Sequence, residues 1–314
     1  MTIVKKLTKD YRIPLLTVLL FVFMCFARPF FPTKANIYAL TDSITAYGIA
    51  ALGFTFVMLA GQLDISFGSV MALTSCCFMM ILTKVGFLPA LLIALLMGCV
   101  CGAVTGFFVA SFRLSPFIVS MTMQLIYKGI ALTITKSTPV SLAYPALTAI
   151  NNCRLFGTVP VVFFLFLLVA LAAEFVLRRT QYGRNLMIVG GNISAADNLG
   201  LRTRYYLWSV FIIQGFCAAL GGIAMMTRMF SASGNLAIDG PLNIIPMVIV
   251  GGTAMAGGRG GTIKTLWGVL LMNIIYNAMS MYSIQASIQQ LVKGLILLII
   301  IVSDKYMENK NAKV

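Results

Sequence analysis

The residues best suited to chemistry lie in one polar stretch, residues 61–69 (GQLDISFGS), between the apolar runs 44–60 and 70–82. A carboxylate at membrane depth, as Asp64 would be, costs about 3 kcal/mol on insertion scales and usually faces a cavity or a partner. The flanking glycines indicate a broken helix, which is tolerated there only where protein covers it or a water-filled path adjoins it. We therefore interpret this stretch as part of a translocation pathway. Its candidate solute ligands are Gln62, Asp64, Ser66 and Ser69.

The same stretch has a simpler interpretation, as a short loop in which Asp64 and Ser66 cap the following helix. The two interpretations are compatible, because the N-terminus of a half-helix is itself a polar site. Asn243 and Asn277 complete the predicted pathway, since a hydroxyl-rich solute favours amides, hydroxyls and a lone carboxylate. Asn273 and Asn277 lie four residues apart on one helix face, where they either bond between helices or line the pathway.

The composition is that of a membrane protein. Of 314 residues, 60% are hydrophobic and only 10% are charged, and the mean hydropathy is +0.97, whereas soluble domains carry about 25% charged residues. No segment is polar enough to fold separately, so residues 1–314 are expected to form a single transmembrane domain. Six of the seven cysteines lie in apolar runs and only Cys153 lies in a predicted loop, so no disulfide framework is indicated.

Hydropathy predicts an all-α polytopic fold with about ten transmembrane helices. The predicted spans are 13–31, 40–60, 65–84, 87–111, 115–135, 158–177, 206–226, 242–257, 264–282 and 285–303. We expect the first to be an uncleaved span rather than a signal peptide. Ten spans place both termini on one side, and most basic residues then fall in cytoplasmic segments, Lys5, Lys6 and Lys9 among them. This bias explains the net charge of +15 without a nucleic-acid partner.

Glycine marks two further features. Gly98, Gly102 and Gly106 lie four residues apart and are predicted to let another helix approach closely. The run 251–261 is dense in glycine, yet it fails the pattern of a phosphate-binding P-loop because the chain contains no Gly-Lys pair. A polar, glycine-broken element thus occurs once in each half of the chain, which is typical of transporters with internal repeats. We therefore expect an internal pseudo-repeat.

The longest polar stretch, residues 178–205, is expected on the cytoplasmic side. Asn192 or Ser194 can cap a short helix that Gly200 ends. Such a helix suits docking into a groove on a soluble partner, and the alternative is an ordinary basic loop. Residues 136–157 form a predicted outside loop, either a connector or a docking surface for an extracytoplasmic partner.

Five blocks in this order resemble the membrane permeases of ribose-type ABC importers, over about residues 35–304. The family is the branch that carries ribose, xylose, arabinose and galactose permeases. The blocks are residues 61–69, residues 115–119 (SPFIV), the loop residues Gly190, Gly191, Asn192, Ala195, Ala196 and Gly200, the glycine-rich run 251–260, and the spacing Gln290…Gly294…Asp304.

The resemblance implies a permease that works as a dimer in the bacterial inner membrane, with both termini cytoplasmic. Copies of a cytoplasmic P-loop ATPase would dock around residues 184–200, at the six loop residues named above. ATP and Mg²⁺ would bind to that partner, so this chain itself would carry no cofactor, no metal and no catalytic residue. An extracytoplasmic solute-binding protein would deliver the solute. The fold would be similar to that of ten-helix importers with an internal pseudo-two-fold axis.

Two departures from the family pattern leave the solute open. Gln62 stands where the family commonly has a small residue, and Pro241-Leu242-Asn243 replaces a frequent Glu-Leu-Asp. The expected solute is a monosaccharide or similar small polar molecule, with a nucleoside, a polyol or a signalling molecule as alternatives. The alternative class is a stand-alone secondary carrier, for which Asp64 and Glu174 are the only candidate buried carboxylates. A membrane enzyme is disfavoured because the chain lacks histidine and any paired-carboxylate site.

Overall fold

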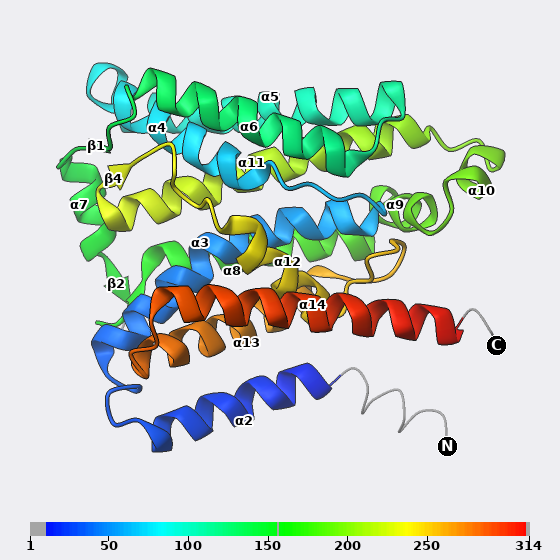
Figure 1. Ribbon diagram of the computed structural model, residues 1–314. Helices are drawn as coiled ribbons and strands as arrows, with labels where there is room; N and C mark the ends of the chain where they lie inside the picture. Colours follow the sequence, from blue (N-terminus) through cyan, green and yellow to red (C-terminus); the bar gives the residue numbers. More distant parts are fainter. Residues whose placement is uncertain (1–10, 156, 312–314) are drawn as a thin grey trace.

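The computed structural model describes residues 11–155 and 157–311, and Lys5, Lys6 and Lys9 lie outside them. Its long helices are α2 (Arg12–Ala27), α3 (Lys34–Leu59), α4 (Phe67–Val85), α5 (Phe87–Phe112), α6 (Pro116–Ile134), α8 (Val161–Arg179), α11 (Thr203–Met229), α12 (Gly240–Gly251), α13 (Thr262–Met281) and α14 (Ala286–Asn311). The short ones are α7 (Pro145–Asn152), α9 (Gln181–Gly191) and α10 (Ile193–Asn198). Figure 1 shows the long helices running roughly along one direction as a bundle.

Each predicted span overlaps one of the long helices, so the expectation of a polytopic helical membrane protein is confirmed. Within the described residues, seven helices are long and apolar enough to cross a membrane, while α2 and α12 are shorter apolar helices. A total of ten spans therefore remains a prediction. The predicted span 242–257 was too long at its end, because α12 stops at Gly251 and Gly252 adopts a left-handed conformation with φ of 102°.

Short strands close the end of the bundle opposite α9 and α10. β1 (Val140–Ser141) pairs antiparallel with β4 (Ser231–Ala232), and β2 (Arg154–Leu155) pairs with β3 (Val159–Pro160). The predicted outside loop 136–157 thus contains β1, α7 and β2, and both of its interpretations, as a connector or as a docking surface, stay open. Helix α2 begins and α14 ends at the other end of the bundle, the same end as α9 and α10 (Figure 1).

Helices α3 and α11 form the centre of the bundle. In their apolar windows 83% and 78% of the residues are buried, whereas 17% are buried in that of α8 and none in that of α14. Small residues let the two central helices approach each other, since a Cβ atom at Gly221 of α11 would lie 2.6 Å from the Ala46 carbonyl oxygen of α3. The outer helices α5, α6, α8 and α14 carry large exposed apolar side chains, as lipid-facing helices do.

The glycines of α5 all face α11. A Cβ atom at Gly98 would lie 2.5 Å from the Gly215 carbonyl oxygen, and one at Gly102 would lie 2.1 Å from the Phe211 carbonyl oxygen. At Gly106 the nearest atom would be the Phe211 Cβ, at 2.9 Å. Backbones this close exclude any side chain, so this spacing of small residues fixes how α5 packs on α11.

Two of the apolar helices start inside the bundle rather than at its ends. After α3 ends at Leu59, residues 60–66 turn back from α9 towards the middle, where α4 begins (Figure 1). After β4, residues 233–239 return from the opposite end and α12 begins. The two helix starts abut, since a Cβ atom at Gly68 would lie 2.7 Å from the Ala237 carbonyl oxygen. We call α4 and α12 the half-helices because each begins inside the bundle, and their N-termini meet at one place in its interior, here called mid-depth.

Candidate functional site

Asp64 lies just before the start of α4 and is 3% exposed. One of its carboxylate oxygens accepts hydrogen bonds from the Ser66 backbone N–H at 2.8 Å and from the Ser66 hydroxyl at 2.6 Å. Ser66 is the N-cap residue of α4, but its hydroxyl bonds to Asp64 and not to a free N–H of the helix. The interpretation of Ser66 as a side-chain cap is therefore wrong, and its hydroxyl serves to hold the carboxylate in place.

The predicted pathway residues lie along the depth of the bundle rather than in one cluster. Ser69 is in the first turn of α4, and Asn243, 3% exposed, is in the first turn of α12, whose start abuts that of α4. Gln62 lies nearer to α10 and lines a cavity of about 240 Å³ with Ser194. The structure therefore brings Asp64, Ser66, Ser69 and Asn243 to the meeting point of the half-helices and places Gln62 towards the α10 end.

Asn273 and Asn277 bond between helices, which was one of the two alternatives for this pair. The Asn277 amide donates to the Asn36 side-chain oxygen at 2.8 Å, and Asn36 donates back at 3.1 Å. The Ser43 hydroxyl donates to Asn273 at 2.9 Å. Both asparagines thus tie α13 to α3, and Asn277 stands apart from the Asp64 group.

Sequence reasoning missed a polar group beside the start of α12. Within the described residues, the Asn243 Oδ1 and the Tyr276 hydroxyl are buried without a hydrogen-bond partner. The Lys293 ammonium of α14 lies 4.7 Å from the centre of the Tyr276 ring, and Gln290 donates to Asp239 at 3.5 Å. The sequence did carry a signal for this group, because Gln290 and Lys293 are polar residues within one apolar span. Unpartnered buried polar atoms in a pathway are natural contacts for a hydroxyl-bearing solute.

Three of the sequence blocks meet at one junction of glycines. The Gly258 N–H donates to the Leu59 carbonyl oxygen at 2.9 Å. A Cβ atom at Gly190 of α9 would lie 1.7 Å from that same oxygen, and one at Gly257 would lie 2.7 Å from the Gly61 Cα. Direct backbone contacts therefore join the C-terminal part of α9 to two other segments. These are the start of the broken segment, residues 60–66, and the glycine-rich turn within residues 251–261.

The glycine-rich turn is a packing element. Its ends are joined by the Ala254 N–H, which donates to the Arg259 carbonyl oxygen at 2.9 Å. The N–H groups of Gly257 and Gly258 donate to carbonyl oxygens of Ala254 and Leu59, so they are not available to bind phosphate. Gly257 and Gly258 have φ of 84° and 70°, conformations that glycine adopts without strain.

The loop between α8 and α11 folds into α9 and the short helix α10. The Asn192 side chain accepts from the Ala195 N–H at 3.0 Å and so caps α10, and Gly200 follows with φ of 76°. The predicted short helix is confirmed, with Asn192 rather than Ser194 as its cap. Ala196 is fully buried while Ala195 is exposed, so α10 presents an outer face that carries Leu199 at 68% exposure.

Glu174 links α8 to the start of α13. Its carboxylate accepts from the Thr262 hydroxyl at 2.6 Å and from the Thr262 and Ile263 backbone N–H groups, and it also pairs with Arg178 at 3.0 Å. A carboxylate at a helix N-terminus satisfies free N–H groups and complements the helix dipole. This acidic side chain therefore has a structural role.

A bundle of long apolar helices, broken at mid-depth by two half-helices, defines a polytopic membrane permease. Residues 36–301 match the family described as "Branched-chain amino acid transport system / permease component". The chain is 31% identical to the ribose import permease protein RbsC of Escherichia coli (strain K12), over 88% of this chain and 87% of that protein. It is 28% identical to RbsC of Haemophilus influenzae, over 93% and 92% of the two chains.

The L-arabinose ABC transporter permease protein AraH of Azospirillum brasilense is 27% identical, over 93% of this chain and 86% of that protein. No solved structure matches the chain. The chain belongs to the membrane permeases of ribose-type ABC importers.

Proposed function

We propose that this chain is the transmembrane permease subunit of an ABC importer that moves a monosaccharide or a similar small polar solute into the cytoplasm. ATP and Mg²⁺ bind to a separate cytoplasmic ATPase, and an extracytoplasmic solute-binding protein delivers the solute. The names of the relatives support the solute class. The family membership and the glycine junction support a permease that forms the pathway while a partner hydrolyses ATP. In this proposal the partner acts on α9 and α10.

The observation that carries the proposal is the direct contact of Gly190 with Leu59 and of Gly257 with Gly61. An ATPase docked on the outer face of α10 moves α9, and α9 bears on the segment 60–66 that holds Asp64. Motion of the ATPase is thereby transmitted to mid-depth without a nucleotide site on this chain. The coupling residues are Gly190, Gly191, Asn192, Ala195, Ala196 and Gly200.

The pathway runs past the meeting point of the two half-helices. Asp64, Ser66 and Ser69 act from the side of α4, and Asn243 acts with Tyr276 from the side of α12. Asp64, Ser66, Ser69 and Asn243 lie at the N-termini of α4 and α12, where free N–H groups and the helix dipole favour oxygen atoms of a solute. Gln62 then lines the exit towards α10.

Matching contacts in the two halves support an internal pseudo-repeat in which α3, α4, α5 and α6 correspond to α11, α12, α13 and α14. Helix α11 packs on α5, and α3 packs on α13. Helix α4 contacts α6, and α12 contacts α14. Each repeat contributes one half-helix, and the two half-helices run in opposite directions (Figure 1).

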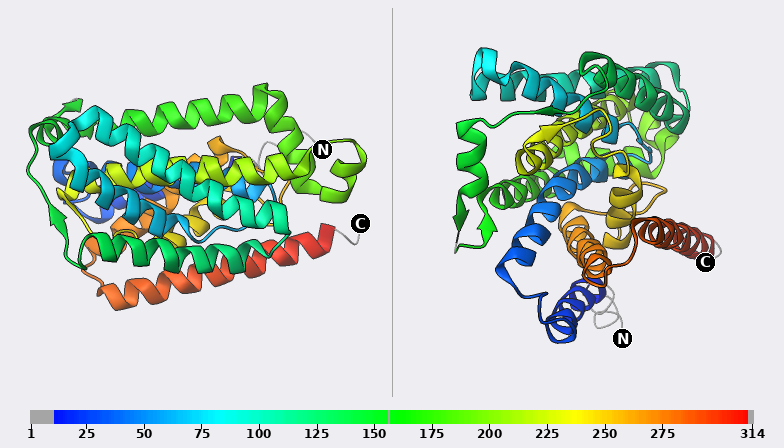
Figure 2. Two further views of the ribbon diagram at one scale, coloured as in Figure 1. Left: turned by 90° about the horizontal axis from the view of Figure 1, so that it is seen from above. Right: turned by 60° about the vertical axis from the view of Figure 1, so that its left-hand side comes forward.

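A second permease copy covers the face bounded by α6 and α14 in this proposal. These helices lie along one long face of the molecule (Figure 2) and expose Leu125 at 69% and Ile299 at 62%. The dimer sits in the inner membrane with both termini cytoplasmic. This orientation places α9 and α10 within reach of the ATPase and the strands β1–β4 towards the solute-binding protein.

The test is reconstitution of this chain into liposomes with and without its ATPase, followed by uptake of radiolabelled ribose and other monosaccharides. We expect uptake only when the ATPase and ATP are present together. Uptake driven by a proton gradient in liposomes without the ATPase would contradict the proposal and indicate a secondary carrier. Purification in mild detergent gives a second readout, in which the ATPase is expected at about one copy per permease.

A further inference from the structure

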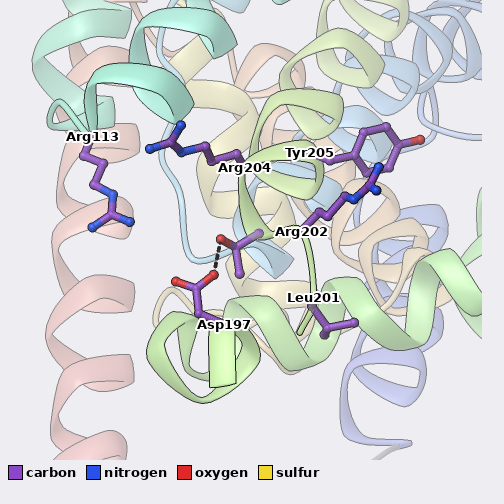
Figure 3. Close-up of a pocket in the computed structure, with 7 residues that line it drawn as sticks. Arg113, Asp197, Leu201, Arg202, Arg204 and Tyr205 are labelled. Atoms are coloured by element: carbon purple, nitrogen blue, oxygen red, sulfur yellow. Dashed lines mark hydrogen bonds between the residues drawn. The ribbon is translucent and has the colours of Figure 1, made fainter. Parts of the chain in front are cut away.

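Three arginines surround a pocket at the end of the bundle where α11 begins. Arg113, Arg202 and Arg204 line a cavity of about 430 Å³ together with Asp197 and Tyr205. Figure 3 shows Arg204 and Arg113 on one side of the pocket and Arg202 beside Tyr205 on the other. The arginines come from two places in the chain, the turn after α5 and the start of α11, so the fold itself gathers them.

The positive charge of this pocket is not neutralised within the described part of the chain. None of the three guanidinium groups forms an ion pair there, whereas Arg178 and Arg228 do. The one carboxylate of the pocket, Asp197, accepts the Thr203 hydroxyl at 2.7 Å (Figure 3). The side chain of the N-cap residue Arg202 makes no capping bond, so the positive end of the α11 dipole adds to the charge.

An apolar groove adjoins the arginine pocket through Tyr205, which lines both. The groove has a volume of about 350 Å³, and its walls come from α8, α9 and α11. Its lining residues are Val176, Tyr182, Tyr205, Trp208, Ser209, Ile212 and Ile213. Trp208 is held in place by its indole N–H, which donates to the Ala103 carbonyl oxygen at 2.8 Å.

We infer that the pocket and groove together bind one anionic phospholipid of the membrane leaflet at this end of the bundle. The guanidinium groups of Arg113, Arg202 and Arg204 hold the phosphate, for which arginine provides bidentate donors. An acyl chain lies in the groove past Trp208. Basic pockets at the ends of membrane helices, flanked by tyrosine and tryptophan, suit lipid headgroups in this way.

The groove distinguishes a lipid from an acidic segment of a partner protein. Ile212 and Ile213 lie about three turns into α11, which is long and apolar enough to cross a membrane. A soluble partner could reach the arginines but not this depth. One phospholipid molecule can occupy both the pocket and the groove, with its charged headgroup at the arginines and an acyl chain in the apolar groove.

The experiment uses the fluorescence of Trp208. The chain has two tryptophans, so the Trp267→Phe variant leaves Trp208 as the only emitter. This variant is placed in nanodiscs of phosphatidylcholine that contain increasing fractions of brominated phosphatidylglycerol or, in parallel, brominated phosphatidylcholine. Bromine quenches tryptophan at short range, so quenching reports an acyl chain in the groove. We expect half-maximal quenching at a several-fold lower fraction of the anionic lipid.

Removing arginines from the same background tests the headgroup pocket. The Arg202→Gln and Arg204→Gln double variant is expected to need roughly 25-fold more brominated phosphatidylglycerol for the same quenching, since each arginine contributes roughly five-fold. Arg259→Gln, an exposed arginine outside the pocket, is the matched control and is expected to change nothing. Arg113→Gln, in the turn after α5, tests the pocket independently if the double variant does not fold.

Two results would overturn the inference. Equal quenching by the two brominated lipids would show that no anionic headgroup is selected and would leave the arginines as a surface for an acidic protein segment. A preference that persists in both arginine variants would show that these side chains do not hold the phosphate.

Discussion

Replacing Gly190 with alanine tests the junction that connects α9 to the broken segment. The new Cβ atom would lie 1.7 Å from the Leu59 carbonyl oxygen and 3.0 Å from the Gly258 nitrogen. Because ordinary contacts begin near 3.4 Å, the junction has to open by more than an ångström. This displacement breaks the 2.9 Å hydrogen bond from the Gly258 N–H to the Leu59 carbonyl oxygen.

The magnitude follows from three opposing contributions. Overpacking a tight site costs about 1–3 kcal/mol, and loss of one backbone hydrogen bond costs about 1 kcal/mol. Alanine is favoured over glycine inside a helix by about 1 kcal/mol. The expected net destabilisation for Gly190→Ala is therefore about 1–3 kcal/mol. The weakened interaction is the packing of α9 against residues 60–66.

The matched control is Gly191→Ala, the next residue of α9. A Cβ atom there meets no atom within 4 Å, so this variant keeps the helix advantage without the clash. We expect Gly190→Ala to lower the midpoint of thermal unfolding by roughly 2–10 °C and to reduce ATP-driven uptake per ATP hydrolysed, while Gly191→Ala keeps the thermal midpoint. Equal thermal stability of the two variants would refute the reasoning.

Three further predictions concern the pathway and the packing of the helices. Asp64→Asn is expected to lower solute uptake while membrane insertion is kept, and unchanged uptake at normal expression would contradict its role. Gly102→Ala is expected to destabilise the bundle by about 1–3 kcal/mol in thermal unfolding, because its Cβ would lie 2.1 Å from a carbonyl oxygen of α11; Gly129→Ala meets no atom within 4 Å and serves as its control. Asn277→Leu is expected to cost about 0.6–1.7 kcal/mol through loss of its bonds to Asn36, and a larger loss of uptake than of stability would instead indicate a pathway role.

The sequence predicted the helices well because apolar length is a local property. Every predicted span overlaps a helix, with the larger errors at the start of α3 and the end of α12. Asn192 caps α10 because an Asn side chain satisfies nearby N–H groups in this position. The end of α12 was placed six residues too far along the chain. The residues that follow Gly251 remain apolar or small, so hydropathy continues where the backbone has already turned at Gly252.

The contacts between distant segments were beyond the reach of sequence patterns. The polar group at Tyr276 and Lys293 combines side chains from α13 and α14, and the glycine junction combines α9 with segments far from it in the chain. Each contributing residue has an ordinary local explanation, such as a tyrosine in a span or a glycine in a turn. Only tertiary packing shows that the Tyr276 hydroxyl is buried without a partner.

The bonding of three carboxylates bears on our proposal that a partner ATPase, rather than a proton gradient, supplies the energy for transport. A proton-coupled carrier needs a buried acid that is free to gain and lose a proton along the pathway. Asp42 pairs with Arg228 at 3.2 Å, and Glu174 is bound at the start of α13. Asp64 accepts two hydrogen bonds from Ser66, which hold its carboxylate in one orientation. In the function proposed above, energy arrives mechanically from a partner ATPase, through α9 and α10 to the segment that carries Asp64.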